Sequence, residues 1–337
     1  SVVVFAEEEA VVQGKLSETG ATEGGLVETS ANYLTTAGID VDTSGETAGG
    51  QWLVDPVDVE VVSTASGPNQ IEASAIESQI DGGSTFTLET SGAGTGSGDI
   101  SLLTSINQTD ASSSGGLILR GRRFEDNNHK INLASWRELL FDINAVNSES
   151  NPTSESIQNA VDAIGTVNGN RLIRLGSGDY GFNSAVTLDT NVEISGQGPL
   201  STQLTTLLAG TKIFRVGAGV EASERGITFT TSGLGANDVG GGIGNLGGLL
   251  TVNDTRFVDN RAYQNGGAID SFAGGIVTVR NSEFINNRSA ANGSGGAIHI
   301  GNSNGFSRIS NKLFEGNSSV KSGGAIKVGT ASVIVDD

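Results

Sequence analysis

Residues 257–269 read FVDNRAYQNGGAI, and the two motifs in this stretch return twice more along the chain. The motif Phe-x-x-Asn begins at Phe257, Phe284 and Phe314, with spacings of 27 and 30 residues. The motif Gly-Gly-Ala-Ile begins at Gly266, Gly295 and Gly323, with spacings of 29 and 28 residues. Two interleaved motifs on one period of this length are typical of a repeat protein in which every repeat is one structural unit.

Short alternating apolar runs separate the motifs, such as Ile276–Val279 and Ala297–Ile300. Runs of this length, bounded by Gly, Asn and Ser, are typical of β-strands. A single repeat cannot bury its apolar face alone, but stacked repeats can, with each strand pairing to the next turn at about 4.8 Å. The sequence therefore predicts an all-β chain folded as a right-handed parallel β-helix, a solenoid.

The motif residues receive structural roles in this interpretation. We expect the paired glycines at corners that require a positive φ or a close approach of two backbones. The three Phe residues should stack as an aromatic ladder inside the solenoid. The last residues of the same motif, Asn260, Asn287 and Asn317, should form a ladder that satisfies backbone groups left unpaired at a turn.

Gly-Gly-Ala-Ile alternating with Phe-x-x-Asn resembles the bacterial polymorphic outer-membrane proteins, which are surface adhesins of the autotransporter kind. The resemblance covers roughly residues 240–330. It implies a β-helical passenger displayed on the outer surface of a bacterium.

A second resemblance covers residues 1–145. Gly24–Ser30 leads to Gly38–Thr43 and then to a closing Trp-Leu-Val-Asp-Pro within Gln51–Pro56. This order is similar to that of filamentous-haemagglutinin-type large exoproteins, although Leu26 stands where that family has Phe. The resemblance implies export across the outer membrane and a long adhesive or matrix-forming fibre. Since Ser1 is not an initiator Met and no signal segment follows, we expect a longer or processed chain.

One short helix is expected between these regions. Ile157, Ala160, Val161 and Ile164 have helical spacing, and Gly165 follows as a stop signal. We therefore predict a helix near residues 154–164 that caps the end of a β-helix. The expected domains are a haemagglutinin-like segment at 1–146, a linker and capping helix at 147–165, and the repeat β-helix at 166–337. Segments within 157–198 also resemble the opening turns of pectate-lyase-like β-helix proteins, at the level of the fold.

Composition and charge exclude several classes of function. Fifty of 337 residues are Gly and none is Cys, which excludes disulfides, thiolate metal sites and thiol nucleophiles. No apolar stretch approaches the length of a membrane span, so we expect no membrane insertion. The net charge is −19, and residues 1–100 hold 17 acidic residues and one basic residue, which argues against a nucleic-acid partner. Two explanations of this acidic charge remain: a solvated surface, or calcium held between carboxylates. No Asp-x-Asp-x-Asp loop supports calcium.

Candidate catalytic residues come from equivalent positions of neighbouring repeats. The residue after each Gly-Gly-Ala-Ile is Asp270, then His299, then Lys327, which predicts a row that is either an acid–base group or a favourable charge ladder on an exposed face. A second row holds Arg261, Arg288 and Ser318, and two stacked arginines suit an anionic glycan or neighbouring acids. A third row, Asp259, Asn286 and Gly316, does not repeat its carboxylate, and His129 lies in a turn without ligand spacing. We therefore assign no catalytic, cofactor or metal residue.

The sequence favours a secreted or cell-surface structural protein of a Gram-negative-type bacterium rather than an enzyme. Its expected role is that of an adhesin or an extracellular filament or matrix component. The expected partners are a host or neighbouring-cell surface, a glycan, or other copies of itself in end-to-end or lateral assembly. The alternative is a pectate-lyase-like β-helix that binds or degrades polysaccharides.

Overall fold

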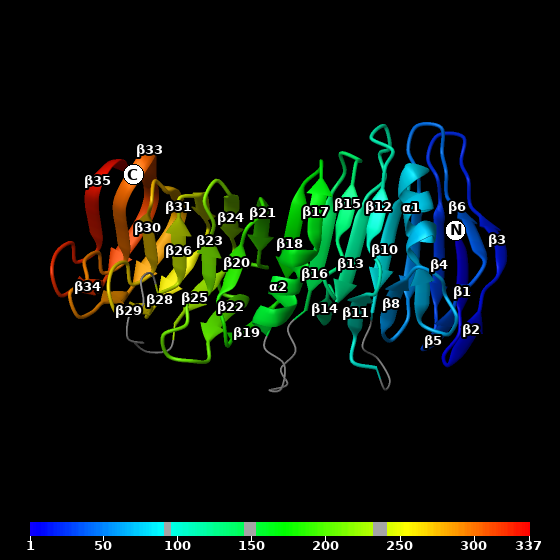
Figure 1. Cartoon of the computed structure of the whole chain (residues 1–337), viewed down its shortest axis with the longest axis horizontal. Coiled ribbons are helices and arrows are strands. Elements are labelled where there is room, and N and C mark those ends of the chain that lie inside the picture. The colour runs from blue at the N-terminus through cyan, green and yellow to red at the C-terminus, as the bar shows by residue number, and fades with distance from the viewer. Residues whose placement is uncertain (91–95, 145–152, 232–240) are drawn as a thin grey trace. The chain divides into compact units, whose positions relative to one another are not determined.

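A computed structural model describes residues 1–90, 96–144, 153–231 and 241–337. Strands make up 53% and helices 6% of it, and the strands pair in parallel to form a β-solenoid of about 12 turns. The predicted parallel β-helix is therefore confirmed (Figure 1). The chain divides into unit 1, Ser1–Asn144 with Asp162–Arg174, and unit 2, Ala145–Val161 with Leu175–Asp337.

Unit 1 has three faces, and most turns contribute one strand to each face. The first face is built from β1 (Val2–Phe5), β4 (Leu26–Ser30), β7 (Gln51–Asp55), β10 (Thr85–Glu89), β13 (Leu117–Gly121) and β16 (Leu139–Ile143). The second is built from β2 (Glu9–Val11), β5 (Tyr33–Thr35), β9 (Gln70–Glu72), β8 (Val59–Val62), β11 (Asp99–Leu102) and β14 (Arg123–Glu125). A further strand, β18 (Arg171–Leu175), follows the last turn.

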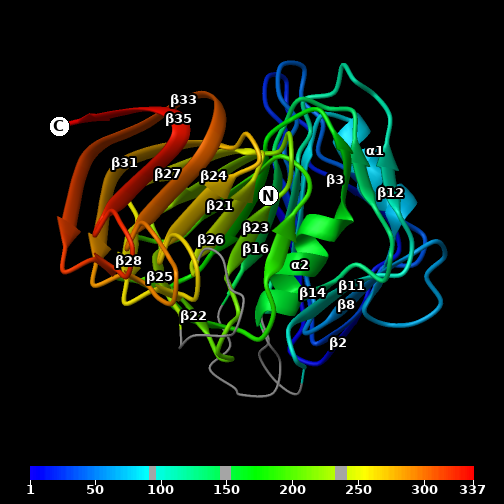
Figure 2. The same ribbon diagram turned by 60° about the vertical axis from the view of Figure 1, so that its left-hand side comes forward.

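The third face of unit 1 is interrupted by a helix. Strands β3 (Gly14–Ser17) and β6 (Ile39–Asp42) form one small sheet. Strands β12 (Ile106–Gln108), β15 (Ile131–Leu133) and β17 (Ile164–Val167) form another. Between them the chain forms α1 (Ala73–Asp81), which contacts both β6 and β12 (Figures 1 and 2). This second helix was not expected from the sequence.

Side chains of α1 supply hydrogen bonds that a strand at this position would make with its backbone. On one side Gln79 donates to the carbonyl oxygen of Val41. On the other side Glu77 Oε1 accepts from the backbone N of Asn107 at 2.6 Å, and Asp81 Oδ1 accepts from Gln108 Nε2 at 2.7 Å. The helix thus joins two half-sheets, because backbone groups at a buried sheet edge need partners.

Replacing Asp81 by alanine should therefore lower the free energy of unfolding by about 0.5–1.5 kcal/mol, since it removes an exposed acceptor of two hydrogen bonds from the next turn. Asp81 Oδ1 also accepts from the backbone N of Asp110. Urea denaturation followed by circular dichroism measures the change. Glu46→Ala, which removes an exposed acid of the same unit, is the control and should change stability little. Equal effects of both variants would contradict the bridging role of α1.

Helix α2 (Thr153–Ala163) lies within a residue of the predicted helix, and all but its last two residues belong to unit 2. Ile157, Ala160 and Val161 are buried, as their spacing predicts. Gln158 accepts from the backbone N of Thr187 at 2.7 Å and donates to its carbonyl oxygen at 3.2 Å, so α2 lies against the first turn of unit 2. The part of the predicted linker at 147–152 lies outside the described residues.

Unit 2 also has three main faces. One consists of β19 (Gly178–Phe182), β22 (Thr202–Thr206), β25 (Thr228–Thr230) and β28 (Arg256–Val258), continued by the ends of β31 (Ile276–Ile285) and β33 (Ile298–Glu315). The next consists of β20 (Val186–Leu188), β23 (Phe214–Val216), β26 (Ile243–Leu246) and β30 (Ile269–Phe272), continued by the starts of β33 and β35 (Ile326–Asp336). The third, side by side in Figure 2, consists of β21 (Val192–Ser195), β24 (Glu221–Arg225) and β27 (Leu249–Asn253), followed by the start of β31, the middle of β33 and the end of β35. A short ladder holds β29 (Arg261–Ala262), β32 (Arg288–Ser289) and β34 (Ser318–Ser319).

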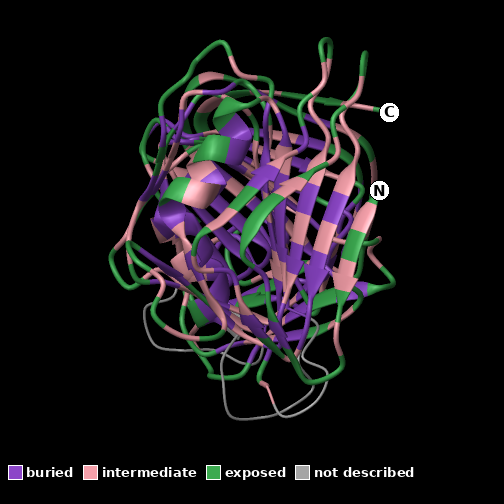
Figure 3. Cartoon of the chain, turned by 90° about the vertical axis from the view of Figure 1, so that its right-hand side faces the viewer, coloured by how far each residue is buried: buried purple, intermediate pink, exposed green. Residues whose placement is uncertain are grey.

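The interior of each unit is filled by aliphatic and aromatic side chains, and buried residues alternate with more exposed ones along the strands (Figure 3). The predicted aromatic ladder is present, with ring centroids of Phe257 and Phe284 4.9 Å apart and those of Phe284 and Phe314 also 4.9 Å apart. Phe229 extends it by one turn at 4.8 Å. Stacked strands impose this spacing, because the rings repeat with the strands.

The predicted asparagine ladder is also present. Asn287 Oδ1 accepts from the backbone N and from Nδ2 of Asn260, at 3.1 and 2.9 Å. Asn287 Nδ2 in turn donates to Asn317 Oδ1 and to the carbonyl oxygen of Phe257, both at 2.9 Å. Asn260 and Asn287 therefore each bind the asparagine of the next turn and a carbonyl oxygen of the previous turn, which belongs to Phe229 for Asn260 and to Phe257 for Asn287.

The glycine pairs occupy corners for the two reasons expected. Gly266 has a φ of 58°, in the left-handed region that glycine adopts without steric cost. Its neighbour Gly267 lies so close to the next turn that a Cβ atom would come within 2.2 Å of the carbonyl oxygen of Gly296. The first glycine therefore sets the backbone conformation, and the second permits the close stacking of turns.

Candidate functional site

The predicted row of Asp270, His299 and Lys327 exists on consecutive strands of unit 2, in register. Asp270 Oδ1 lies 2.6 Å from His299 Nδ1. The expectation of an exposed charge ladder is wrong for Asp270, whose side chain is 3% exposed, while that of His299 is 16% exposed. The histidine on the next strand partners the carboxylate, which compensates for its burial.

This pair has the geometry of an oriented acid–base group. A carboxylate bound to Nδ1 fixes the ring and leaves Nε2 as the nitrogen that can exchange a proton with another molecule. Gly301 lies beside the ring, and a Cβ there would be 3.3 Å from His299 Cε1. Within the described residues, no group of three or more His, Cys, Asp or Glu side chains could hold a metal ion.

The second predicted row, Arg261, Arg288 and Ser318, is also in register. Both arginine side chains are exposed. Of the two kinds of partner considered for these arginines, an anionic glycan or neighbouring acids, the nearby acid Glu283 pairs instead with Arg256.

The third row is a structural corner. Asp259 and Asn286 both have φ of 55°, and Gly316 has φ of 64°. Asn, Asp and Gly are the residues that tolerate this left-handed conformation best, which explains why the carboxylate does not repeat. The row is therefore shaped by backbone conformation rather than by chemistry.

His129 lies in the turn that the sequence predicts. Its backbone N donates to the carbonyl oxygen of Asp126 at 2.8 Å, and the preceding Asn127 and Asn128 have φ of 47° and 63°. The side chain is half-buried and belongs to neither of the depressions described below.

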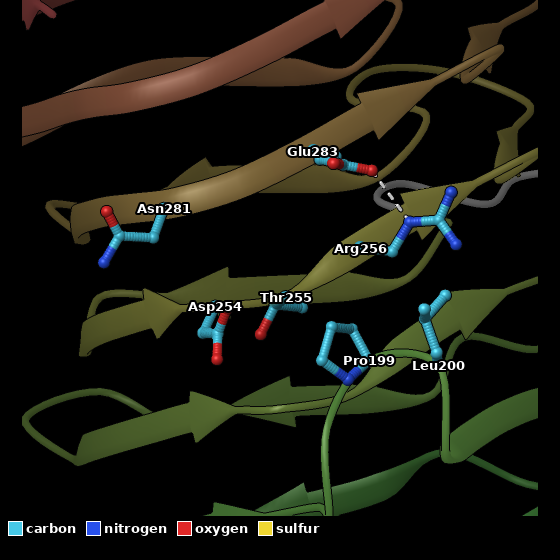
Figure 4. A pocket seen from close by; sticks show the side chains of 7 residues that line it. All are labelled: Pro199, Leu200, Asp254, Thr255, Arg256, Asn281 and Glu283. Atoms are coloured by element: carbon cyan, nitrogen blue, oxygen red, sulfur yellow. Dashed lines mark hydrogen bonds and ion pairs between the residues drawn. The ribbon is translucent and has the colours of Figure 1, made fainter.

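Unit 2 carries a surface depression of about 330 Å³ that the sequence analysis did not identify (Figure 4). Pro199 and Leu200, in the turn before β22, form its apolar side, and Leu200 is 77% exposed. Arg256 Nε and Glu283 Oε2 form an ion pair at 2.8 Å on its other side. The remaining lining residues are Asp254, Thr255 and Asn281. Its residues come from three different turns, so no local sequence signal marks it.

Unit 1 carries a depression of about 360 Å³ lined by three acidic residues, Asp58, Glu60 and Asp99. Asp58 Oδ1 accepts from the backbone N of Gly98 at 2.7 Å and from that of Asp99 at 2.9 Å. Arg123, on the neighbouring strand, pairs with Asp99 at 3.0 Å. The remaining lining residues are Val59, Pro68, Asn69, Ser97 and Ser101.

Charged side chains on the faces of the solenoid mostly stand opposite charges of the other sign. Arg120 pairs with Glu89 on one neighbouring strand and with Asp142 on the other. Lys15 is in register with Asp40 on the neighbouring strand and also forms an ion pair with Asp42 of that strand. Such in-register opposite charges stabilise adjacent strands modestly.

Glu224 is an unusual residue that the sequence analysis missed. It points into the interior of unit 2, is 0% exposed, and neither carboxyl oxygen has a hydrogen-bond partner. Its register neighbours are Ile194 and Val252. Burial, and to a lesser extent the nearby charge of Glu193, raises the pKa of Glu224 well above its ordinary value.

In the part of the chain that the structure describes, no helix is long and apolar enough to cross a membrane. Comparisons with protein-family models, with curated proteins and with solved structures find no match to the chain.

Proposed function

We propose that the chain is a structural β-solenoid of a bacterial outer surface or extracellular matrix, acting as an adhesin or a filament component. We further propose that it is of the filamentous-haemagglutinin type, with repeats like those of polymorphic outer-membrane proteins. The observation that carries the proposal is the use made of the repeat motifs. Their Phe, Asn and Gly residues serve internal ladders and corners, which stiffen a scaffold.

A rigid scaffold with surface depressions such as those of units 1 and 2 suits recognition or assembly through a surface. The test is attachment of beads coated with the purified protein to cultured epithelial cells and to bacterial cells, together with electron microscopy of the protein at high concentration. Attachment above that of albumin-coated beads, or ordered assemblies, is the expected result. Soluble particles that neither attach nor assemble would contradict the proposal.

One specific observation favours a second function, that of a polysaccharide-degrading β-helix. The buried Asp270 orients His299 as an acid–base catalyst would require. If the chain is a structural scaffold, we expect no cleavage of neutral or acidic polysaccharides with or without calcium. His299→Gln should then leave the attachment of coated beads to cells unchanged.

Release of reducing ends or of unsaturated products measures cleavage. Cleavage by the wild-type chain that disappears in His299→Gln, but persists in a matched variant of the other histidine, His129→Gln, would establish the enzyme and overturn the scaffold function. Since His129 lies in a turn outside the row, its replacement controls for general loss of a histidine.

A further inference from the structure

Two arginines of unit 2 face each other on neighbouring strands. Arg261 of β29 is in register with Arg288 of β32, and both side chains are exposed. On another face of the same turns the registered residues are Arg256 and Glu283, which form an ion pair. Like charges directly opposite each other destabilise a pair of strands. The stacked guanidinium groups would therefore be stabilised by an anionic partner.

The corner that contains these arginines is basic in an otherwise acidic protein. Its three stacked segments, 261–265, 288–294 and 318–322, hold Arg261, Arg288 and Lys321 and no acidic residue. Lys321 is exposed, and its backbone N donates to the carbonyl oxygen of Gly293 in the turn before. We call Arg261, Arg288 and Lys321 the basic corner. Among the described residues, none of its side chains forms an ion pair.

The chain itself carries a surface of complementary charge. The acidic depression of unit 1, lined by Asp58, Glu60 and Asp99, contains no basic lining residue. Arg123 neutralises Asp99, whereas Glu60 is exposed and its carboxylate accepts only from Gln70 among the described residues. The depression thus presents two carboxylates that no cation of the described chain pairs with.

We propose that the basic corner of one copy docks in the acidic depression of a second copy. Guanidinium groups pair well with carboxylates, so Asp58 and Glu60 are suitable partners for Arg261 and Arg288. Since the two surfaces differ, the contact is heterologous and joins copies head to tail. The inference rests on the proposed structural function and names the partner for that function.

Sedimentation velocity over a range of protein concentrations and salt concentrations tests the contact. The wild-type chain should associate in a concentration-dependent manner, and added salt should dissociate it. Arg261→Glu with Arg288→Glu should weaken association by about tenfold or more, because close charge pairs at interfaces couple strongly. Glu60→Lys should weaken it as well. Arg280→Glu, an exposed arginine of β31 that faces Asn253, is the control and should have little effect.

Mixing the two variants distinguishes docking from a general effect of charge. The double arginine variant keeps the wild-type acidic depression and Glu60→Lys keeps the wild-type basic corner. Their mixture should therefore form heterodimers through this one unaltered contact, whereas either variant alone should associate weakly. A wild-type chain that stays monomeric, or an equal effect of Arg280→Glu, would overturn the proposal. The proposal would also be overturned if the chain stays monomeric and a sulfated-polysaccharide column retains it through Arg261 and Arg288. Attachment of coated beads to cells is measured separately, so failure of self-docking leaves the scaffold function standing.

Discussion

Replacing Asn287 by alanine should lower the free energy of unfolding by about 3–5 kcal/mol, the largest loss that we expect from a single substitution. Asn287 is fully buried in the middle of the asparagine ladder. Its removal takes the acceptor from the backbone N and from Nδ2 of Asn260, and the donor from the carbonyl oxygen of Phe257 and from Asn317 Oδ1. A buried polar group that loses its partner costs about 1–3 kcal/mol.

Chemical denaturation of the whole chain measures this loss, and Asn302→Ala is the matched control. Asn302 is exposed on β33, so its replacement removes the same side chain from a position without ladder contacts. If both alanine variants unfold at the same denaturant concentration, the ladder does not stabilise unit 2 in the way that its hydrogen bonds indicate. Because the ladder joins several turns, we also expect Asn287→Ala to broaden the unfolding transition.

Glu224→Gln should raise stability at neutral pH and leave it nearly unchanged in acid. The carboxyl of Glu224 is buried among Ile194 and Val252, and its pKa is raised well above the ordinary value of 4.5. In the unfolded chain the same group ionises near its ordinary pKa. Between the two pKa values the folded state binds more protons than the unfolded state, so the free energy of unfolding of the wild type falls as pH rises.

The fall begins near pH 4.5 and ends at the raised pKa, with a slope of about 1.4 kcal/mol for each pH unit. Glutamine has nearly the same shape and cannot ionise, so the difference between the two stability curves isolates this one group. Glu221→Gln, on the exposed side of the same strand, is the control and should not reproduce the effect. Parallel curves for the wild type and Glu224→Gln would show that Glu224 is solvated or paired.

The repeats made the fold of unit 2 predictable. Phe257, Asn260 and Gly266 recur at the spacing of one turn, and parallel stacking follows once that spacing is recognised. The helix α2 was predictable for a similar reason, since its buried residues follow helical spacing. In both cases a periodic pattern reports which side chains face the interior.

The helix α1 was missed although a signal was present. Ala73, Ile76 and Ile80 have helical spacing and are buried, but the segment is short and lies between strands. Nothing in the local sequence shows that a helix can take the position of a strand there. That depends on Gln79 and Asp81, whose partners are about 40 residues before and about 27 residues after them in the chain.

For the candidate site, the sequence predicted only which residues lie next to each other on neighbouring strands. Register follows from the repeats, which is why Asp270 and His299 were expected to be neighbours. Burial of Asp270 was not expected. Alternation along a strand predicts the face on which a side chain lies, but it does not predict that His299 of the next turn covers the carboxylate. The depression of unit 1 is lined by residues of two turns and that of unit 2 by residues of three, so single positions of the sequence predict neither. Burial of Glu224 was not predicted either, because one polar residue among alternating apolar residues changes the pattern little.

The interruption of one face of unit 1 by α1 has a mechanical consequence. On the other two faces of that unit, backbone hydrogen bonds run from turn to turn past this point, through β7 and β10 on one face and β8 and β11 on the other. On the third face, tension along the stack passes from β6 to β12 through the side chains of Glu77, Gln79 and Asp81. Side chains extend under load more readily than a backbone ladder, so this face acts as a compliant joint in an otherwise stiff unit.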